Sequence, residues 1–352
     1  MSILKKPEAV RKLREFHRQV QANGGRIGTL LRVIEFVYDN ACNFRCEHCS
    51  TRSAIGDKSA HLMSYEKVGE IADEAHELGV YELNLYGGEL LIRPKAVFEL
   101  LKAVKPERFY TFLTTNGYLM TQDRAYELAD AGVDRVSVSI DSLNAEEHDG
   151  FRGAKGALER ALNALEYVKK AGMQPYMNIT VGHFNAMSPE LEEMCKYSYD
   201  RGYITFMNIA MPVGCWQGKF EVMIDEKDSA HLIELRKKYK NILRDIWNPF
   251  DKEYEKSLGC QSISKMYITQ NGDVTPCSFI QIKLGNLYEQ SLKEIIDYGY
   301  SIKYFHDHYE TCLAGENRWF AEKFLTGEMS MQHPADAKAL FTEDDYIQRE
   351  EK

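Results

Sequence analysis

The 352-residue sequence has no apolar run long enough to span a bilayer, and it has no low-complexity tract. A membrane-spanning helix needs about 20 consecutive apolar residues. The N-terminal stretch of residues 1–6 leads directly into charged residues, so we expect no secretory signal peptide. These absences predict a cytoplasmic protein without a membrane anchor.

The sequence also lacks a basic block, because its formal net charge is -9 and the charges are dispersed along the chain. Nucleic-acid phosphates and anionic membrane surfaces attract clusters of Lys and Arg. We therefore expect neither a nucleic acid nor a membrane as a partner. With 44% hydrophobic residues, the chain can bury a large core.

Cysteine, in contrast, occurs eight times. In a cytosolic protein this number indicates metal ligation or catalysis and not a disulfide framework. Cys42, Cys46 and Cys49 lie on one short loop with C-x3-C-x2-C spacing, just after an apolar stretch at 30–38 that is typical of a strand. Three thiolates so spaced can hold three corners of a [4Fe-4S] cluster and leave the fourth iron open. The alternative is a structural zinc site that adds His48, but His48 is too close to its cysteine neighbours to reach the same ion.

This loop resembles the cluster loop of the radical S-adenosylmethionine (SAM) superfamily, with His48 in the aromatic position before the last cysteine. The resemblance implies that SAM chelates the open iron through its amino and carboxylate groups. It also implies that reductive cleavage gives a 5'-deoxyadenosyl radical, which abstracts hydrogen from a substrate. In this class of enzyme the protein supplies binding, orientation and exclusion of water. A flavodoxin- or ferredoxin-type electron donor is the partner that such chemistry implies.

Strand and helix patterns alternate about six times along the chain. Strands are expected near residues 30–38, 81–86, 109–114, 135–140, 176–181 and 204–210, and helices near 65–78, 96–104, 124–131, 157–170 and 190–201. This alternation predicts an α/β fold with a parallel sheet, here a partial (β/α)6 TIM-type barrel over residues 29–222. An amphipathic helix within residues 1–28 is expected to pack on this core. The strands' carboxyl ends would hold the active site.

Unusual polar residues and glycines gather at these strand ends and resemble the SAM-binding positions of the family. The predicted cofactor-binding residues are Gly87, Gly88, Glu89, Thr115, Asn116, Ser137, Ser139, Asp141, Arg152 and His48. The Gly-Gly-Glu segment resembles the one that hydrogen-bonds the methionine amino group of SAM, and Arg152 would pair with the SAM carboxylate. Each also has a structural interpretation: a plain turn for the glycines, backbone capping for the hydroxyls, and a surface ion pair with Glu146 or Glu147 for Arg152.

The C-terminal part contains three further cysteines around a hairpin signal. Asn271-Gly272 lies between apolar alternations that are flanked by Cys260 and Cys277, and Cys312 follows. The stretch resembles the SPASM extension of radical SAM enzymes, or its shorter twitch version, and this implies one auxiliary [4Fe-4S] cluster. We expect a smaller hairpin-plus-helix domain at 223–320 and a polar tail at 321–352.

Two cysteines remain to be assigned. Cys195 falls on the inner face of an expected helix and is predicted to be a buried apolar residue. Cys215, just after the sixth strand, is a tentative fourth ligand of the auxiliary cluster, and its alternative role is donation of a hydrogen atom to a substrate radical.

The function that these features predict is a radical SAM oxidoreductase or epimerase. Its predicted substrate is a small polar natural product of the carbohydrate or aminocyclitol type. Two alternatives stay open: a maturase that epimerises or cross-links a ribosomal peptide, and a non-catalytic iron-sulfur electron carrier. The carrier needs none of the residues at the strand ends.

Overall fold

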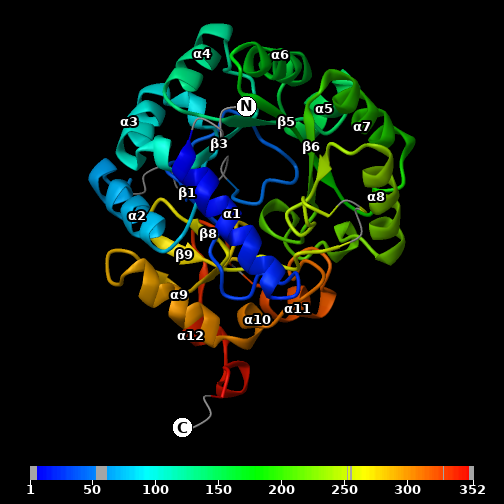
Figure 1. Cartoon of the computed structure of the whole chain (residues 1–352). Helices are drawn as coiled ribbons and strands as arrows, with labels where there is room; N and C mark the ends of the chain where they lie inside the picture. The colour runs from blue at the N-terminus through cyan, green and yellow to red at the C-terminus, as the bar shows by residue number, and fades with distance from the viewer. Residues whose placement is uncertain (1–5, 53–61, 252, 254–255, 328, 349–352) are drawn as a thin grey trace.

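The computed structural model describes residues 6–52, 62–251, 253, 256–327 and 329–348. Its main sheet has ten strands in the order β11-β9-β8-β1-β2-β3-β4-β5-β6-β7. Strands β1 to β7 are neighbours in chain order, and all their pairings are parallel. Helices surround this curved sheet (Figure 1). The predicted α/β class with a mostly parallel sheet is confirmed.

The barrel strands are β1 (Val33–Val37), β2 (Glu82–Tyr86), β3 (Tyr110–Thr115), β4 (Arg135–Ser139), β5 (Gln174–Val181), β6 (Ile204–Ile209) and β7 (Ile242–Leu243). The helices between them are α2 (Tyr65–Glu77), α3 (Pro94–Val104), α4 (Gln122–Asp130), α5 (Ala145–Arg152), α6 (Ala157–Lys170), α7 (Pro189–Arg201) and α8 (Glu226–Lys238). Both α8 and β7 lie past residue 222, so the barrel pattern continues into the region 223–320 that was assigned to the smaller C-terminal domain.

Local capping explains where several of these helices begin. Ser64, Thr121 and Ser188 each accept a hydrogen bond from the backbone N–H three residues further on, at α2, α4 and α7. Such caps satisfy N–H groups that the first helical turn leaves without partners. Ser64 was the start predicted for α2. Each helix then places its apolar side chains against the strands, in one core that extends through the barrel.

Helix α1 (Pro7–Ala22) closes the end of the barrel where the strands begin (Figure 1). Its Phe16 and Val20 are buried together with Tyr81 and Leu258. Lys6, just before the helix, forms a buried ion pair with Asp134 at 2.5 Å and donates to the Phe109 carbonyl at 3.0 Å. The N-terminal helix thus packs on the core.

The C-terminal part continues the same sheet. β8 (Lys265–Ile268) pairs in parallel with β1, β9 (Asp273–Thr275) is antiparallel to β8, and β11 (Gly285–Asn286) is antiparallel to β9. The β8–β9 turn contains Gly272 with φ +82°, a conformation that favours glycine. The hairpin expected from Asn271-Gly272 is therefore present.

Helices α9 (Leu292–Ser301) and α10 (Lys303–His306) follow the hairpin. The remaining elements are α11 (Arg318–Phe324), α12 (Ala337–Leu340) and the short pair β10 (Ile282–Lys283) and β12 (Ala335–Asp336). The tail packs against the molecule: Met331 is buried with Val37 and Tyr267, and the Gln332 amide donates to the Thr51 carbonyl at 2.9 Å. This tail segment thus lies against the end of the cysteine loop.

Among the described residues, no helix is both long and apolar enough to cross a membrane.

Candidate active site

The loop that carries Cys42, Cys46 and Cys49 lies at the carboxyl ends of the barrel strands, and all three cysteines line one cavity of about 190 Å³. Backbone hydrogen bonds fix the loop on two sides. The Cys49 carbonyl accepts from the Cys215 N–H at 3.0 Å, and the Glu47 N–H donates to the Phe151 carbonyl at 3.0 Å. The cysteines are therefore positioned by α5 and by the segment that follows β6.

Burial makes the thiols of Cys42 and Cys46 poor acids in the free protein. It raises the pKa of Cys42 to about 12, and it raises the pKa of Cys46 although the Arg152 charge opposes the shift. Cluster ligation needs thiolates, so the protons must leave when iron binds. The donor set fits an iron-sulfur cluster, whose own charge favours the deprotonated ligands.

The spacing of the cysteines differs from that of a mononuclear zinc site. In the described part of the chain, one group of three metal-ligand side chains has all its donor atoms within 4.8 Å of one another, namely His183, Asp225 and Asp228. Ligands of one zinc ion with Zn–S of about 2.3 Å lie about 3.8 Å apart. Cys42, Cys46 and Cys49 are not such a group among the described residues. The His183 group belongs to the capping box at the start of α8.

Gly87 and Gly88 line the cavity directly after β2. A Cβ on Gly88 would lie 2.3 Å from the Ala41 carbonyl oxygen and 2.5 Å from that of Asn40. A backbone hydrogen bond also joins the two segments, because the Gly88 N–H donates to the Asp39 carbonyl at 2.9 Å. The glycines are thus required where the end of β2 meets the cysteine loop.

Glu89 supports the cavity wall without lining the cavity. Its carboxylate accepts from the Thr115 hydroxyl at 2.8 Å, the Asn116 N–H at 2.7 Å and the Leu91 N–H at 3.0 Å. Burial raises the Glu89 pKa in spite of these donors. Thr115 and Asn116 both line the cavity, so Glu89 holds the end of β3 against the turn after β2.

Arg152 is buried and lines the cavity, which differs from its surface interpretation. Its Nε and one Nη contact Asp141 at 2.6 and 2.5 Å, and the other Nη lies 3.9 Å from Cys46 Sγ. Asp141, behind it, also accepts from the Thr180 N–H at 2.9 Å. The Arg152 charge holds the pKa of Asp141 below its usual value although burial alone would raise it. Arg152 thus brings a fixed positive charge to the cysteine loop.

His48 packs its ring on Phe151, with 4.5 Å between centroids and 7° between planes, and it is close to Trp216. Burial and the Arg152 charge lower the His48 pKa to about 3, so the ring is neutral near pH 7. Its Nδ1 is buried and has no hydrogen-bond partner among the described residues. His48 lines the cavity, so its ring forms an aromatic part of the cavity wall.

Seven of the ten predicted cofactor-binding residues line this cavity: Gly87, Gly88, Thr115, Asn116, Ser139, Arg152 and His48. Ser137 lies lower on β4 and lines a different cavity, while Glu89 and Asp141 stand behind the wall. Residues that the site prediction omitted include Tyr86, Thr114, Asn178, Thr180, Asn208, Tyr267 and Ser278. Tyr86 lies two positions before Gly88, Thr114 two before Asn116, and Asn178 two before Thr180, so the period of two along a strand was a signal for these four. Asn208 lies opposite Thr180 on the neighbouring strand β6.

Cys260, Cys277 and Cys312 line a second, smaller cavity of about 60 Å³. Burial raises the pKa of the Cys277 and Cys312 thiols. The charge of Cys260 adds to both shifts and that of Cys277 adds to the shift of Cys312, which places the three together. Five residues line both this cavity and the first one: Asn208, Ile209, Met211, Ser278 and Phe279. The two cysteine triplets therefore stand on either side of a shared wall.

The structure does not bring Cys215 to the second triplet. Cys215 is exposed, its backbone bonds to Cys49, and it is absent from the lining of the second cavity. The neighbouring Gly214 packs closely on the cysteine loop, because a Cβ there would lie 2.3 Å from the Cys49 carbonyl oxygen. Cys195 is fully buried on α7, as predicted.

The sequence patterns of two known families match this chain. The Radical SAM superfamily matches residues 37–197, and the SPASM iron-sulfur cluster-binding domain matches residues 260–314. The chain belongs to the radical SAM superfamily and carries a SPASM domain. It is therefore a radical SAM enzyme, and the expected SAM and iron-sulfur cofactors are confirmed at the level of the family.

Known relatives have different activities. The chain is 30% identical over 288 residues to an AdoMet-dependent heme synthase of Methanosarcina barkeri, covering 75% of this chain and 81% of the relative. It is 29% identical over 267 residues to the PqqA peptide cyclase of Rhizobium meliloti, covering 72% and 70%. Streptococcus suis SuiB bound to S-adenosylmethionine shares the fold, with a TM-score of 0.59, 17% identity, and coverage of 84% and 69%.

Proposed function

We propose that this enzyme oxidises a small polar molecule held in the barrel lumen, beside a cluster bound by Cys42, Cys46 and Cys49. The cluster and SAM, when bound, supply reductive cleavage of SAM and a radical that abstracts hydrogen. The chain's own residues have the tasks of holding SAM, orienting the substrate and excluding water.

We propose that SAM lies in the cavity beside the cysteine loop, which we call the SAM-end cavity. Gly87 and Gly88 expose backbone groups beside the cysteine loop, and the neutral His48 ring offers a stacking surface. Arg152 offers a positively charged guanidinium, which its ion pair with Asp141 holds in place. We propose that this charge attracts the SAM carboxylate and stabilises the Cys46 thiolate.

The substrate end is polar and enclosed. Asn178 and Thr180 on β5 and Asn208 on β6 line the cavity, and the Asn208 amide donates to Asn178 Oδ1 at 3.0 Å. Side-chain amides and hydroxyls orient a polar ligand better than an apolar one. A carbohydrate is one molecule of this kind, although no relative described above favours it.

Oxidation is favoured by the wall that the two cavities share. An electron that leaves a substrate radical needs an acceptor nearby, and a cluster on Cys260, Cys277 and Cys312 would stand directly behind Asn208 and Ser278. We propose these three cysteines as its ligands and a non-cysteine group at its fourth iron. A flavodoxin- or ferredoxin-type protein is the proposed donor of the first electron.

Anaerobic turnover tests this proposal. Reconstituted enzyme is reduced with SAM, and 5'-deoxyadenosine is measured by mass spectrometry with and without candidate substrates. Production of 5'-deoxyadenosine and a product two hydrogens lighter than its substrate supports oxidation. A product that has unchanged mass in ordinary water and gains one deuterium in deuterated water indicates epimerisation. Absence of SAM cleavage under all conditions favours the electron carrier.

Peptide maturation is the second candidate function. A peptide cyclase is among the relatives at 29% identity, and the similar SuiB fold has been solved with a precursor peptide. The same turnover assay run with peptide substrates in place of small molecules separates the two candidates.

A further inference from the structure

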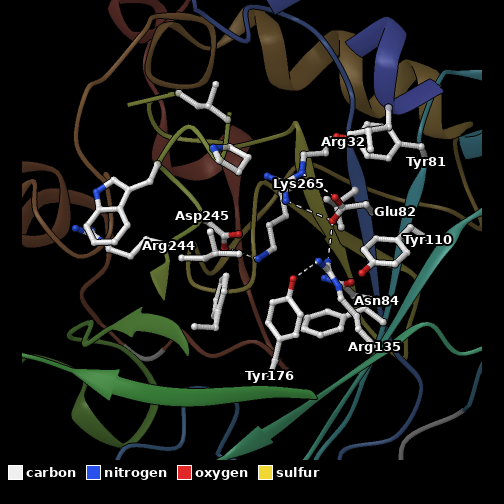
Figure 2. A pocket seen from close by; sticks show the side chains of 18 of the residues that line it. Arg32, Tyr81, Glu82, Asn84, Tyr110, Arg135, Tyr176, Arg244, Asp245 and Lys265 are labelled. Carbon is white, nitrogen blue, oxygen red and sulfur yellow. Dashed lines mark hydrogen bonds and ion pairs between the residues drawn. The ribbon is translucent and has the colours of Figure 1, made fainter. Parts of the chain in front are cut away.

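A separate cavity of about 200 Å³ occupies the opposite end of the barrel lumen, where the strands begin. We call it the lower chamber. Its inner part is lined by charged and polar side chains, including Arg32, Glu82 and Arg135 (Figure 2). Its outer part is apolar, with Phe16 and Val20 contributed by α1. Barrel interiors of this type are usually filled by branched aliphatic side chains, so an open polar space here is unusual.

The charged side chains that line the lower chamber include more cations than anions. Four cationic side chains line it, Arg32, Arg135, Arg244 and Lys265, against the two carboxylates Glu82 and Asp245. Two further carboxylates pair with these cations from outside the lining. Glu35 lies 3.2 Å from Lys265, and Glu316 lies 2.9 Å from Arg244. The chamber therefore presents more positive than negative groups to a ligand.

One carboxylate serves two guanidinium groups at the inner end. Glu82 contacts Arg32 Nε at 3.3 Å and Arg135 Nη2 at 2.9 Å, as the dashed lines in Figure 2 show. Lys265 pairs with two carboxylates, Asp245 at 2.5 Å and Glu35 at 3.2 Å, so the buried network as a whole is balanced. At its inner end, however, two guanidinium groups share one carboxylate. A second carboxylate there would give each guanidinium a partner of its own.

Arg135 has a free donor at this place. The residue is only 9% exposed, and its guanidinium lies 4.0 Å from the Phe112 ring centroid and 4.7 Å from that of Tyr110. One Nη faces the Tyr176 hydroxyl at 3.3 Å, while Nε has no hydrogen-bond partner among the described residues. A buried N–H without an acceptor is rare in folded proteins. Arg135 also lines the chamber, so a ligand oxygen bound there would lie beside its guanidinium.

A purely structural role explains part of this network. The contacts of Glu82 with Arg32 and Arg135 connect the starts of β1, β2 and β4 and would stabilise the barrel without any ligand. That role leaves the open space and the unpartnered Arg135 Nε unexplained.

We propose that the lower chamber binds the carboxylate of a small molecule with an apolar body. The carboxylate lies against Arg135 and Arg32, and the body packs on Phe16 and Val20 of α1. Tyr86 and Asn178 line both this chamber and the SAM-end cavity, so they stand between the two. This ligand site is distinct from the place proposed above for the small polar substrate.

The test is calorimetric titration of the reconstituted holoenzyme with three probes of one shape: 4-phenylbutyrate, 4-phenylbutanol and 4-phenylbutylamine. We expect the carboxylate to bind at least tenfold more tightly than the alcohol, and the amine not to bind. Arg135→Gln should weaken 4-phenylbutyrate at least tenfold, and Arg135→Lys should give a smaller loss because the charge remains. Arg124→Gln, at a half-buried position of α4 outside the chamber lining, is the matched control and should bind as the wild type does.

Equal binding of the acid and the amine, no binding of the acid, or unchanged affinity in folded Arg135→Gln overturns the proposal. If Arg135→Gln does not fold, the Arg135→Lys protein and the three wild-type titrations still decide it. SAM cleavage is measured separately on the same samples. A protein that binds the acid but does not cleave SAM refutes the proposed function and keeps the binding site, and the reverse result refutes only the site.

Discussion

The two cysteine triplets differ in how the chain brings their members together. Cys42, Cys46 and Cys49 lie within eight residues on one loop, whereas Cys260, Cys277 and Cys312 are spread over more than fifty residues and meet only through the β8–β9 hairpin and the segment after α10. Spacing alone identifies the first triplet. The second is defined by the fold, so the two should respond differently to substitution.

The largest effect is expected for the local triplet. Cys42→Ala should lower the iron content from about eight to about four per chain, since two clusters of four become one. It should also abolish SAM cleavage. Iron analysis and the 5'-deoxyadenosine assay measure this, and Cys195→Ala, which removes a buried thiol outside both triplets, is the control with full iron content. SAM cleavage by Cys42→Ala would remove this loop from the active site.

Substitution in the second triplet should separate the two cofactors. Cys277→Ala is expected to lose about four irons per chain and all substrate oxidation, because the acceptor is lost. SAM cleavage should persist, since no residue of the first triplet changes. Wild-type iron content near four per chain would contradict the presence of a second cluster.

An intermediate effect is expected from a substitution at the junction between the cysteine loop and β2. Gly88→Val places a branched side chain against the Ala41 and Asn40 carbonyls, which should cost about 1–3 kcal/mol of stability and displace the loop. SAM affinity, measured by calorimetry, should fall while the fold persists. Gly150→Val is the control, because nothing lies within 4 Å of a Cβ at Gly150. Unchanged SAM affinity in Gly88→Val would mean that the loop tolerates the displacement.

The smallest effect on metal content is expected at Cys215. Because Cys215 lies beside the first loop and outside the lining of the second cavity, Cys215→Ser should leave iron content and the spectrum of the auxiliary cluster unchanged. An altered auxiliary spectrum would instead support the fourth-ligand role. Lost turnover with intact clusters would support hydrogen donation, and solvent deuterium in the wild-type product would confirm it.

The sequence was sufficient to predict the parts of the fold that repeat locally. The strand and helix periods, the Ser64 cap and the Asn271-Gly272 turn each depend on neighbouring residues, and each is present. Helix α5 was missed: the segment 145–152 was interpreted through single residues, although Asn144 caps it by accepting from the Glu146 and Glu147 N–H groups.

Parts of the site depend on long-range contacts and could not be predicted. The sequence does not reveal that Tyr267 and Ser278 from the C-terminal part line the SAM-end cavity, because this follows from pairing of β8 with β1. The Arg152–Asp141 pair likewise joins a helix end to a strand end. A single sequence contains no signal for such partners beyond their charges.

The parallel pairing of β8 with β1 has a mechanical consequence. Both cysteine groups are attached to one hydrogen-bonded ladder in which Val33 lies opposite Lys265 and Phe36 opposite Ile268. Strand positions advance by about 3.3 Å per residue, so a slip of one residue would change the tunnelling distance between the clusters by a comparable amount and turn every side chain of β8 to the other face. The rate of the electron transfer that we propose would therefore depend on the strand register. Exchange of C-terminal domains among relatives should succeed only where that register is kept.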